Sequence, residues 1–489
     1  MANIRQETIS GVKWGAISKY FRAASTFLLG IILARLITAE EYGILGMTAV
    51  FFAIAEIFID SGFATALIRK MDATAEDAST VFYYNMALSV FFYVVLYFSS
   101  PYIAKLLNEP VLLSLVRVSG LSLILGAFAS VQKALVRKRR EFKLAAIISM
   151  IATILSIPIV LYFAYNGYGV WALVFHQLAR NFLVAVLYWF LAKWRPSLVF
   201  SKKSFKEFFA FGNKILAQAL LSSAYRYLTP FFIGKFYSPA QLGYYTKGSE
   251  LASTPGNSFF SVIMNVTFPI LSNVQDNDEL LFRTYSKFIK TCSIVIFFVM
   301  IFIIVMAKPL VILLYSERWV QSIIFVQIFS FSSILSHVNN VNLNLFLVKG
   351  RSDILLKVEV YKKIVFFAFM AMTLPFGVIP FAVGGVVASH ICIALNIYYS
   401  GKLFGLTYRK QAADFLPYLL IAAVSCLPAL AVSFLNIPHY LSLTIGGIIS
   451  FAVYVIWLWK KRDEAFFDLI KIIPLKYRRL LRLPNIEDS

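Results

Sequence analysis

Long apolar runs alternate with short polar, Gly- or Pro-containing segments over nearly the whole chain. Most runs reach about 20 residues, the length that an α-helix needs to cross the hydrocarbon core of a bilayer. They are too long for strands and too uniformly apolar for the helices of a soluble protein. The pattern predicts fourteen membrane-spanning helices, over residues 12–36, 42–67, 80–100, 112–135, 144–164, 168–192, 208–234, 241–270, 284–307, 320–348, 355–374, 380–401, 414–434 and 441–459.

Composition supports this pattern. Apolar residues make up 60% of the 489 residues and charged residues 14%, against about half and about a quarter in a soluble domain. This balance excludes a soluble enzyme, a disordered protein and a disulfide-rich secreted scaffold. Cys292, Cys392 and Cys426 lie in apolar runs without metal or disulfide spacing, so we predict no metal site and no cofactor. The polar N-terminus leads into an uncleaved first span.

The distribution of the 46 Lys and Arg residues predicts the orientation of the chain. With the N-terminus in the cytoplasm, 31 of them fall in inside segments or in the first two turns of the adjoining spans, and four fall in outside loops. Since positive residues are retained in cytoplasmic loops, we expect both termini inside. The net charge of +22 therefore indicates membrane topology, and we predict no nucleic-acid partner.

Charged residues inside the predicted spans are the main functional clue. Apart from the cations already counted on the inside and Asp414 at the first position of its span, eleven are cations and four are anions. Each costs at least about 2.5–3.5 kcal/mol at the bilayer centre, so such residues face a bundle interior or a wet cavity. We predict that a cavity is lined by Lys19, Arg22, Arg180, Lys214, Arg226 and Lys247. Two readings stay open for the acidic residues, proton or sodium coupling and simple counter-ions: Glu56, Asp60 and Glu250.

Other polar residues in and beside the spans can be explained by their immediate surroundings. Arg35, Arg117 and Lys133 lie near span ends, where long cationic side chains reach the interface. His337 and the nearby asparagines make the span 320–348 unusually polar, which suits either sugar binding or hydrogen bonds between helices. The basic tail, within 460–489, suits either contact with anionic lipid or simple solvation.

The chain contains an internal repeat. The turn at 34–43 reads ARLITAEEYG and the turn at 234–243 reads GKFYSPAQLG, with matching residue classes at nearly every position. Six predicted spans separate them, so both halves have the same orientation. This indicates parallel repeats about an axis along the membrane normal, a plan that transporters use with the substrate site between the halves. The alternative is that two short hairpins share common turn chemistry.

Three segments carry a resemblance to a known family. They are A-R-L-x-T-x-E-E-Y-G at 34–43, RKRREF at 137–142, and I-G-K-F-x-S-x-x-x-L-G-Y-Y at 233–245 followed by FPILSNVQDND at 268–278. Together they resemble the lipid-linked oligosaccharide flippases of O-antigen type, in the MATE-like superfamily. One departure is Thr229, where many relatives carry an acidic residue, and this argues against cation coupling at that position.

The resemblance implies an all-α polytopic membrane protein with two six-helix lobes related by a pseudo-twofold axis. We predict an N-lobe at 1–207, a C-lobe at 208–403, two appended spans at 404–459 and a basic tail at 460–489. It also implies export of undecaprenyl-pyrophosphate-linked glycans across a bacterial inner membrane. We expect a monomer, coupled to a proton or sodium gradient or to none, that works beside the glycan polymerase machinery.

Two other functions fit parts of the sequence. A MATE-like multidrug cation antiporter would share the architecture, but a cationic drug favours an acidic cavity and the interior charges here are mostly positive. A membrane glycan polymerase, ligase or glycosyltransferase needs a large outside loop or a soluble catalytic domain. The predicted outside loops are short, and the sequence has no nucleotide-binding Gly-rich motif or metal-ligand cluster. We therefore predict that the protein is not an enzyme.

Overall fold

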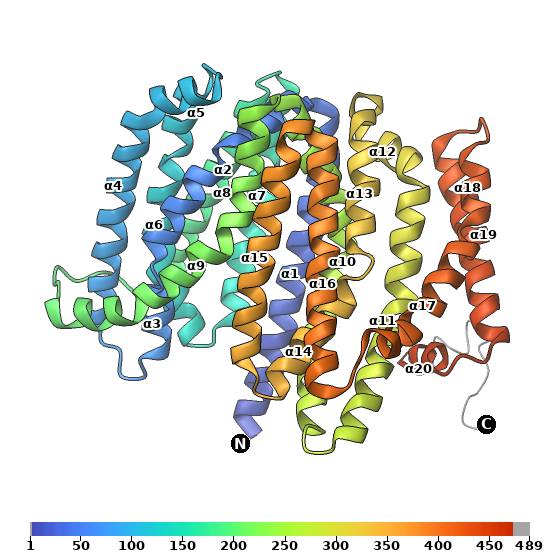
Figure 1. Cartoon of the computed structure of the whole chain (residues 1–489). Coiled ribbons are helices and arrows are strands. Elements are labelled where there is room, and N and C mark those ends of the chain that lie inside the picture. The colour runs from blue at the N-terminus through green and yellow to red at the C-terminus, as the bar shows by residue number, and fades with distance from the viewer. Residues whose placement is uncertain (1, 473–489) are drawn as a thin grey trace. The chain divides into compact units, whose positions relative to one another are not determined.

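The computed structural model describes residues 2–472, without the side chains at 2–10, 12, 214, 221–222, 224–225, 257–265 and 471–472. All regular elements in this part of the chain are helices (Figure 1). The chain divides into two compact units, Met1–Gly243 and Tyr244–Ser489, called unit 1 and unit 2 below. The predicted all-helical fold is confirmed.

Unit 1 contains nine helices and the first residues of a tenth. They are α1 (Ala2–Leu36), α2 (Ala39–Asp60), α3 (Phe63–Arg69), α4 (Ala75–Leu107), α5 (Leu112–Ser119), α6 (Leu121–Lys138), α7 (Phe142–Tyr165), α8 (Val170–Leu191), α9 (Lys202–Phe236) and α10 (Pro239–Asn273). In this unit α7 packs against α1 and α8, α6 packs against α4 and α8, and α2 packs against α9. α2 also packs against α4, α6 and α8. The helices α1, α2, α6 and α8, which carry charged residues singled out in the sequence, therefore belong to one bundle.

Unit 2 contains the remaining helices. They are α11 (Asp278–Val305), α12 (Ala307–Tyr315), η1 (Glu317–Ser322), α13 (Ile323–Ser333), α14 (Ser336–Val348), α15 (Ser352–Thr373), η2 (Leu374–Phe376), α16 (Val378–Phe404), α17 (Tyr408–Ser425), α18 (Leu427–Ser433), α19 (His439–Lys460) and α20 (Glu464–Ile472). The main packing partners are α15 with α16, α11 with α17, and α18 with α19 (Figure 1). A core cluster that includes Tyr285, Phe297 and Phe415 joins α11 to α17.

All fourteen predicted spans coincide with helices, although eleven helical segments of the described residues are long and apolar enough to cross a membrane. The three predicted spans outside that set lie on α9, α10 and α15. α1 also begins ten residues before its predicted span, since the polar N-terminal arm is helical. A membrane protein with many spans is therefore supported, and the number fourteen stays a prediction.

Four predicted spans are interrupted within their apolar runs. The clearest break separates α2 from α3 at Ser61 and Gly62, which adopt φ angles of 39° and 72°. Gly62 takes this left-handed conformation at little steric cost, whereas in Ser61 it is strained. The other breaks lie at Gly120, at Ile334–Leu335 and at Cys426. Hydropathy does not detect them because the apolar pattern continues through each one.

The two repeat turns have the same local structure. Thr38 accepts a hydrogen bond from the backbone N–H of Glu41 at 3.3 Å, and the Glu41 side chain accepts one from the backbone N–H of Thr38 at 2.8 Å. Ser238 and Gln241 make the same reciprocal pair at 3.2 and 3.3 Å. Such capping boxes satisfy free N–H groups at a helix start. The likeness of the two turns therefore extends from residue classes to hydrogen bonds, and a repeat of whole six-helix lobes stays a prediction.

These turns also pack on each other in a reciprocal way. A Cβ atom at Gly43 would overlap the backbone carbonyl of Pro239, and one at Gly243 would overlap the carbonyl of Ala39. Pro239 and Gly243 are the repeat equivalents of Ala39 and Gly43. Each glycine thus allows its helix to approach the start of the other, and the contact has local twofold symmetry.

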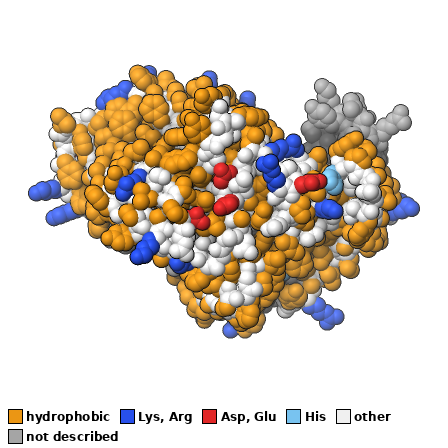
Figure 2. Space-filling view, turned by 90° about the horizontal axis from the view of Figure 1, so that it is seen from above, with side chains coloured by type: hydrophobic (Ala, Val, Ile, Leu, Met, Phe, Trp, Pro, Cys, Tyr) orange, Lys and Arg blue, Asp and Glu red, His pale blue; other side chains and the backbone are white. Residues whose placement is uncertain are grey.

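The surface is mainly apolar. Hydrophobic side chains cover most of the face that Figure 2 shows, and many large ones are exposed, such as Phe190 at 77% and Phe434 at 81%. A groove of about 460 Å³ between α6, α7 and α8 is lined by apolar side chains such as Phe163, Phe175 and Phe182. A soluble protein rarely exposes so much apolar surface. A surrounding bilayer accounts for it.

The glycine contact gives the first prediction. An alanine in a helix is ordinarily about 0.5–1 kcal/mol more favourable than a glycine. Gly43→Ala should nevertheless lower the thermal unfolding midpoint in detergent, because the added Cβ has no room. Gly15→Ala is the matched control, and it should leave the midpoint unchanged or raise it. Within the described part of the chain, no atom outside its own stretch of helix lies within 4 Å of its Cβ position. A raised midpoint in Gly43→Ala would contradict the tight crossing.

Candidate functional site

A polar cavity of about 230 Å³ lies within unit 1. Four helices supply its polar and charged lining: Glu56 and Asp60 from α2, Asn85 from α4, Ser122, Ser130 and Lys133 from α6, and Asn181 from α8. Glu56 and Asp60 are four residues apart, so one face of α2 presents both carboxylates. Both are exposed, although they lie within and at the end of an apolar helix. The cavity therefore opens at the surface of the described chain.

The neutral residues of the cavity keep hydrogen-bonding capacity for a ligand or water. Asn85 donates from Nδ2 to Ser130 Oγ at 3.0 Å, which ties α4 to α6. Among the residues that the structure describes, its Oδ1 atom and the Ser122 hydroxyl are buried without a hydrogen-bond partner. Buried polar atoms of this kind normally bind something, so ordered water or a ligand group is expected beside them.

Charges of both signs surround this cavity. Lys133 interacts electrostatically with Glu56 and Arg180, and Asp60 interacts with Arg137. Arg180 in turn lies within electrostatic range of Arg22 on α1. The structure therefore brings four of the predicted site residues, Arg22, Arg180, Glu56 and Asp60, into one charged region of unit 1.

Lys133 belongs to this region, contrary to our expectation that it reaches the membrane interface. The expectation was wrong because it used only the depth of the residue along its span. A second signal was present in the sequence. Small and polar residues recur at helical spacing along α6, at Ser122, Gly126, Ser130, Lys133 and Arg137, and define one polar face. Arg117 does have a local partner, the Ser100 hydroxyl at 2.9 Å.

The other predicted cavity cations lie elsewhere or are undescribed. Lys19 is exposed one turn before Arg22 on α1, and Arg226 is exposed on α9. Lys247 of α10 is buried in unit 2, where it pairs with Glu250 at 2.9 Å and approaches the ring of Tyr315. The side chain of Lys214 lies outside the described residues. Cavity lining by these four therefore stays a prediction.

The polar residues of α14 join helices of unit 2. His337 shares a hydrogen bond with Ser293 of α11 at 2.8 Å. Asn342 donates to Gln411 of α17 at 2.9 Å and accepts from Ser400 of α16 at 2.5 Å. Of the two readings left open, hydrogen bonding between neighbouring helices therefore applies to His337 and Asn342. The hydrogen bonds of Asn342 attach α17 to α14 and α16.

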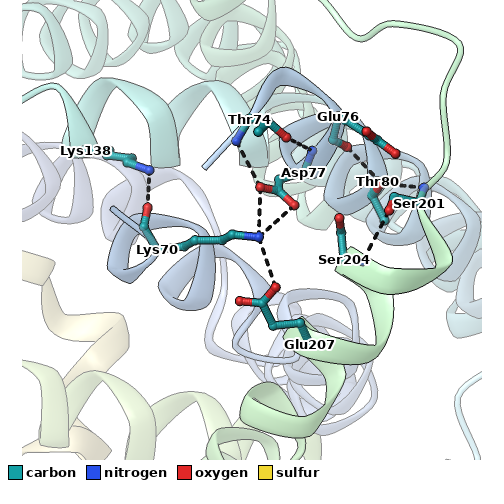
Figure 3. A network of polar contacts seen from close by, with 9 residues as sticks. All are labelled: Lys70, Thr74, Glu76, Asp77, Thr80, Lys138, Ser201, Ser204 and Glu207. Atoms are coloured by element: carbon teal, nitrogen blue, oxygen red, sulfur yellow. Dashed lines mark hydrogen bonds and ion pairs between the residues drawn. The ribbon is translucent and has the colours of Figure 1, made fainter. Parts of the chain in front are cut away.

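A second polar network fixes the start of α9 in unit 1 (Figure 3). The Lys70 ammonium lies between Asp77 of α4, at 3.1 Å, and Glu207 of α9, at 3.0 Å. Thr80 accepts a hydrogen bond from the backbone N–H of Ser201 at 3.0 Å, and Lys138 donates to the carbonyl of Lys70. The bond to Glu207, together with Asp77, raises the pKa of Lys70 above its ordinary value. In the predicted topology this network is cytoplasmic.

The chain matches the model of the family described as "Polysaccharide biosynthesis protein" over residues 32–324. It is 25% identical over 356 residues to the teichuronic acid biosynthesis protein TuaB of Bacillus subtilis, covering 72% of this chain and 74% of that protein. It is 24% identical over 437 residues to the lipopolysaccharide biosynthesis protein WzxC of Escherichia coli, covering 88% of each.

Among solved structures, the lipid II flippase MurJ in its inward closed conformation has the same fold. The TM-score is 0.75 at 14% sequence identity, over 92% of this chain and 98% of MurJ. These matches confirm the resemblance stated from the sequence motifs. The prediction that the protein is not an enzyme is confirmed as well.

The Lys70 network gives a prediction about stability. Lys70→Met removes the cation that pairs with the buried carboxylate of Asp77. The free energy of unfolding should therefore fall by about 1–3 kcal/mol at pH 7. Because the pKa of Lys70 is raised in the folded protein, its stabilising effect is complete below the ordinary lysine pKa of 10.5 and is lost as the pH rises above it. The difference in stability between the unmodified protein and Lys70→Met should therefore shrink only in strong alkali. Chemical unfolding in detergent measures it. Lys203→Met, at an exposed cation of the same segment, should change little.

Proposed function

The chain belongs to the polysaccharide biosynthesis protein family, and on this premise we propose that it is a flippase for lipid-linked oligosaccharides. It moves undecaprenyl-pyrophosphate-linked repeat units from the cytoplasmic to the periplasmic leaflet of a bacterial inner membrane by alternating access. The relatives named for teichuronic acid and lipopolysaccharide biosynthesis support a glycan substrate, and the fold shared with a lipid II flippase supports a lipid-linked one.

The observation that carries this proposal is Lys133 in the polar cavity of unit 1, with Arg180 within its electrostatic range and Arg22 within that of Arg180. A pyrophosphate cannot enter hydrocarbon without losing hydration that is worth many kcal/mol. Cations in a wet cavity replace that hydration, while the prenyl chain stays in lipid. Arginine suits this role because its planar fork makes paired, charge-assisted hydrogen bonds to phosphate oxygens.

Glu56 and Asp60 supply the site for ion coupling in this proposal. Two carboxylates on one helix face, open to water and beside Lys133 and Arg137, can exchange a proton or bind a sodium ion. Either event alters the charge that the neighbouring cations present to a phosphate. Glu250 is assigned a counter-ion role, since it pairs directly with Lys247.

The membrane arrangement follows from the charge distribution. The proposal places both termini in the cytoplasm, because 31 Lys and Arg residues then face inward and four outward. In this proposal the protein is a monomer of fourteen spans with two six-helix lobes. It delivers its glycan to a polymerase on the periplasmic side of the membrane.

The substrate role of Arg180 is tested by reconstitution with a fluorescent lipid-linked oligosaccharide. Arg180→Ala should slow translocation by about tenfold or more, as expected when a charge-assisted contact worth at least about 1.5 kcal/mol is lost. Arg180→Lys should keep part of the rate, because it preserves the charge without the fork. Lys105→Ala is the control, since Lys105 is exposed at the end of α4 and outside the cavity. Normal translocation by Arg180→Ala would reject the cationic site.

Coupling is tested separately with imposed gradients. Glu56→Gln and Asp60→Asn keep the shape of the side chain and remove its charge. At least one of them should make the translocation rate insensitive to a proton or sodium gradient that accelerates the unmodified protein. Equal sensitivity in both variants would place coupling elsewhere. Efflux of a cationic dye, with no lipid-linked substrate moved, would instead favour a multidrug antiporter.

A further inference from the structure

A second cavity, of about 620 Å³, lies in unit 2 at one end of the bundle. Five cations and four carboxylates line it. The cations are Arg283, Lys287 and Lys290 of α11 with Lys461 and Arg462 after α19, and the carboxylates are Asp414, Asp463, Glu464 and Asp468. Figure 1 shows α20 beside the lower ends of α11 and α17, the elements that carry most of this lining. None of these residues belongs to the site proposed for transport.

Three contacts between helices hold the cavity walls. Lys287 pairs with Asp468 of α20 at 2.7 Å, and Lys290 pairs with Asp414 of α17 at 3.4 Å. The Tyr418 hydroxyl donates to Asp463 at 2.9 Å, while Asp463 also accepts from the backbone N–H of Phe466 and so caps α20. Phe466 and Ile470 pack into the core of unit 2, which fixes α20 in place. The cavity is therefore part of the fold.

Some cations of the cavity lining are paired with a carboxylate and others are not. Two lysines and two carboxylates pair with each other, and Asp463 is engaged by neutral donors. Among the described residues, Arg283, Lys461 and Arg462 have no carboxylate within ion-pairing distance, and Glu464 has no cation. The five cations and four carboxylates of the lining leave a net charge of +1. This charge matches a single phosphodiester better than a pyrophosphate.

The surroundings of the cavity place it at the edge of the membrane. Trp457 and Trp459 on the last turn of α19 are 41% and 37% exposed. Leu416 and Leu420 on α17 are exposed at 44% and 58%. Tryptophans with exposed apolar residues on one side and Lys and Arg on the other mark the boundary between hydrocarbon and headgroups. A ligand in this cavity would therefore lie at the level of the headgroups, with these exposed side chains at the level of the acyl chains.

We infer that this cavity is a binding site for the phosphodiester headgroup of an anionic phospholipid, held by Arg283, Lys461 and Arg462. Arginine and lysine bind the phosphate oxygens, and the exposed tryptophans of α19, Trp457 and Trp459, contact the acyl chains. The lipid links the ends of α11, α17 and α19 with α20. The site is independent of the transported substrate, so its test does not depend on the proposed function.

The test counts lipids bound to the delipidated full-length protein by native mass spectrometry. Phosphatidylglycerol should bind more tightly than phosphatidylcholine. Arg283→Gln combined with Arg462→Gln should weaken the tightest phosphatidylglycerol site by about tenfold, because two charge-assisted contacts are lost. Lys202→Gln with Lys203→Gln is the matched control, since it removes two exposed cations outside the cavity and should leave binding unchanged. Equal affinity in all three proteins overturns the proposal.

Two further measurements distinguish a phospholipid from free phosphate and from a prenyl pyrophosphate. Glu464→Gln raises the net charge of the cavity without removing a phosphate contact, so it should tighten phosphatidylglycerol binding; unchanged or weaker binding contradicts the electrostatic argument. Competition by millimolar inorganic phosphate would identify a free-anion site, and preference for a prenyl pyrophosphate would identify a substrate site. Either result rejects the phospholipid. Unchanged unfolding midpoints in phosphatidylcholine show that the variants fold.

Discussion

The structure depends on one constraint, that a charged group in a membrane must be met by an opposite charge, by hydrogen-bond partners or by water. Unit 1 satisfies it with a polar, open cavity in which Glu56 lies near Lys133, and Asp60 interacts electrostatically with Arg137. Unit 2 satisfies it by direct pairing, with Lys247 buried against Glu250. The two solutions have different uses. A direct pair stabilises a position, whereas charges open to water can exchange partners, and transport needs that exchange.

The sequence predicted the fold class and the likeness of the two turns because both depend on patterns that the chain carries locally. Apolar run length predicts a membrane helix directly. The repeat was predicted from residue classes in two turns, and the structure adds the reason for them. Gly43 and Gly243 are needed because each lies against the backbone of the other turn, and Glu41 and Gln241 each close a capping box. Turn chemistry and close packing explain why these positions match.

The site was predicted less well, because its geometry depends on how each helix is rotated about its own axis. Arg22 and Lys247 look alike in sequence, as single cations in apolar spans, yet one is exposed and the other is buried in an ion pair. Lys133 was misassigned since depth along a span says nothing about the face that a residue occupies. The break at Ser61–Gly62 was missed for a similar reason. This break is packed against Gly212 of α9, where an added Cβ atom would overlap the Ser61 carbonyl. The sequence of α2 and α3 alone does not reveal this contact.

A mixed cavity is better suited to moving a phosphate than a purely cationic one. Cations alone would repel one another when empty and would hold a pyrophosphate too firmly to release it. Lys133 has both a carboxylate, Glu56, and a second cation, Arg180, within electrostatic range. In the proposed function a phosphate and Glu56 therefore compete for the same lysine. Neutralising Glu56 by a proton or a sodium ion favours phosphate binding, and by reciprocity bound phosphate favours that neutralisation. One lysine thus links the coupling ion to the substrate without direct contact between them.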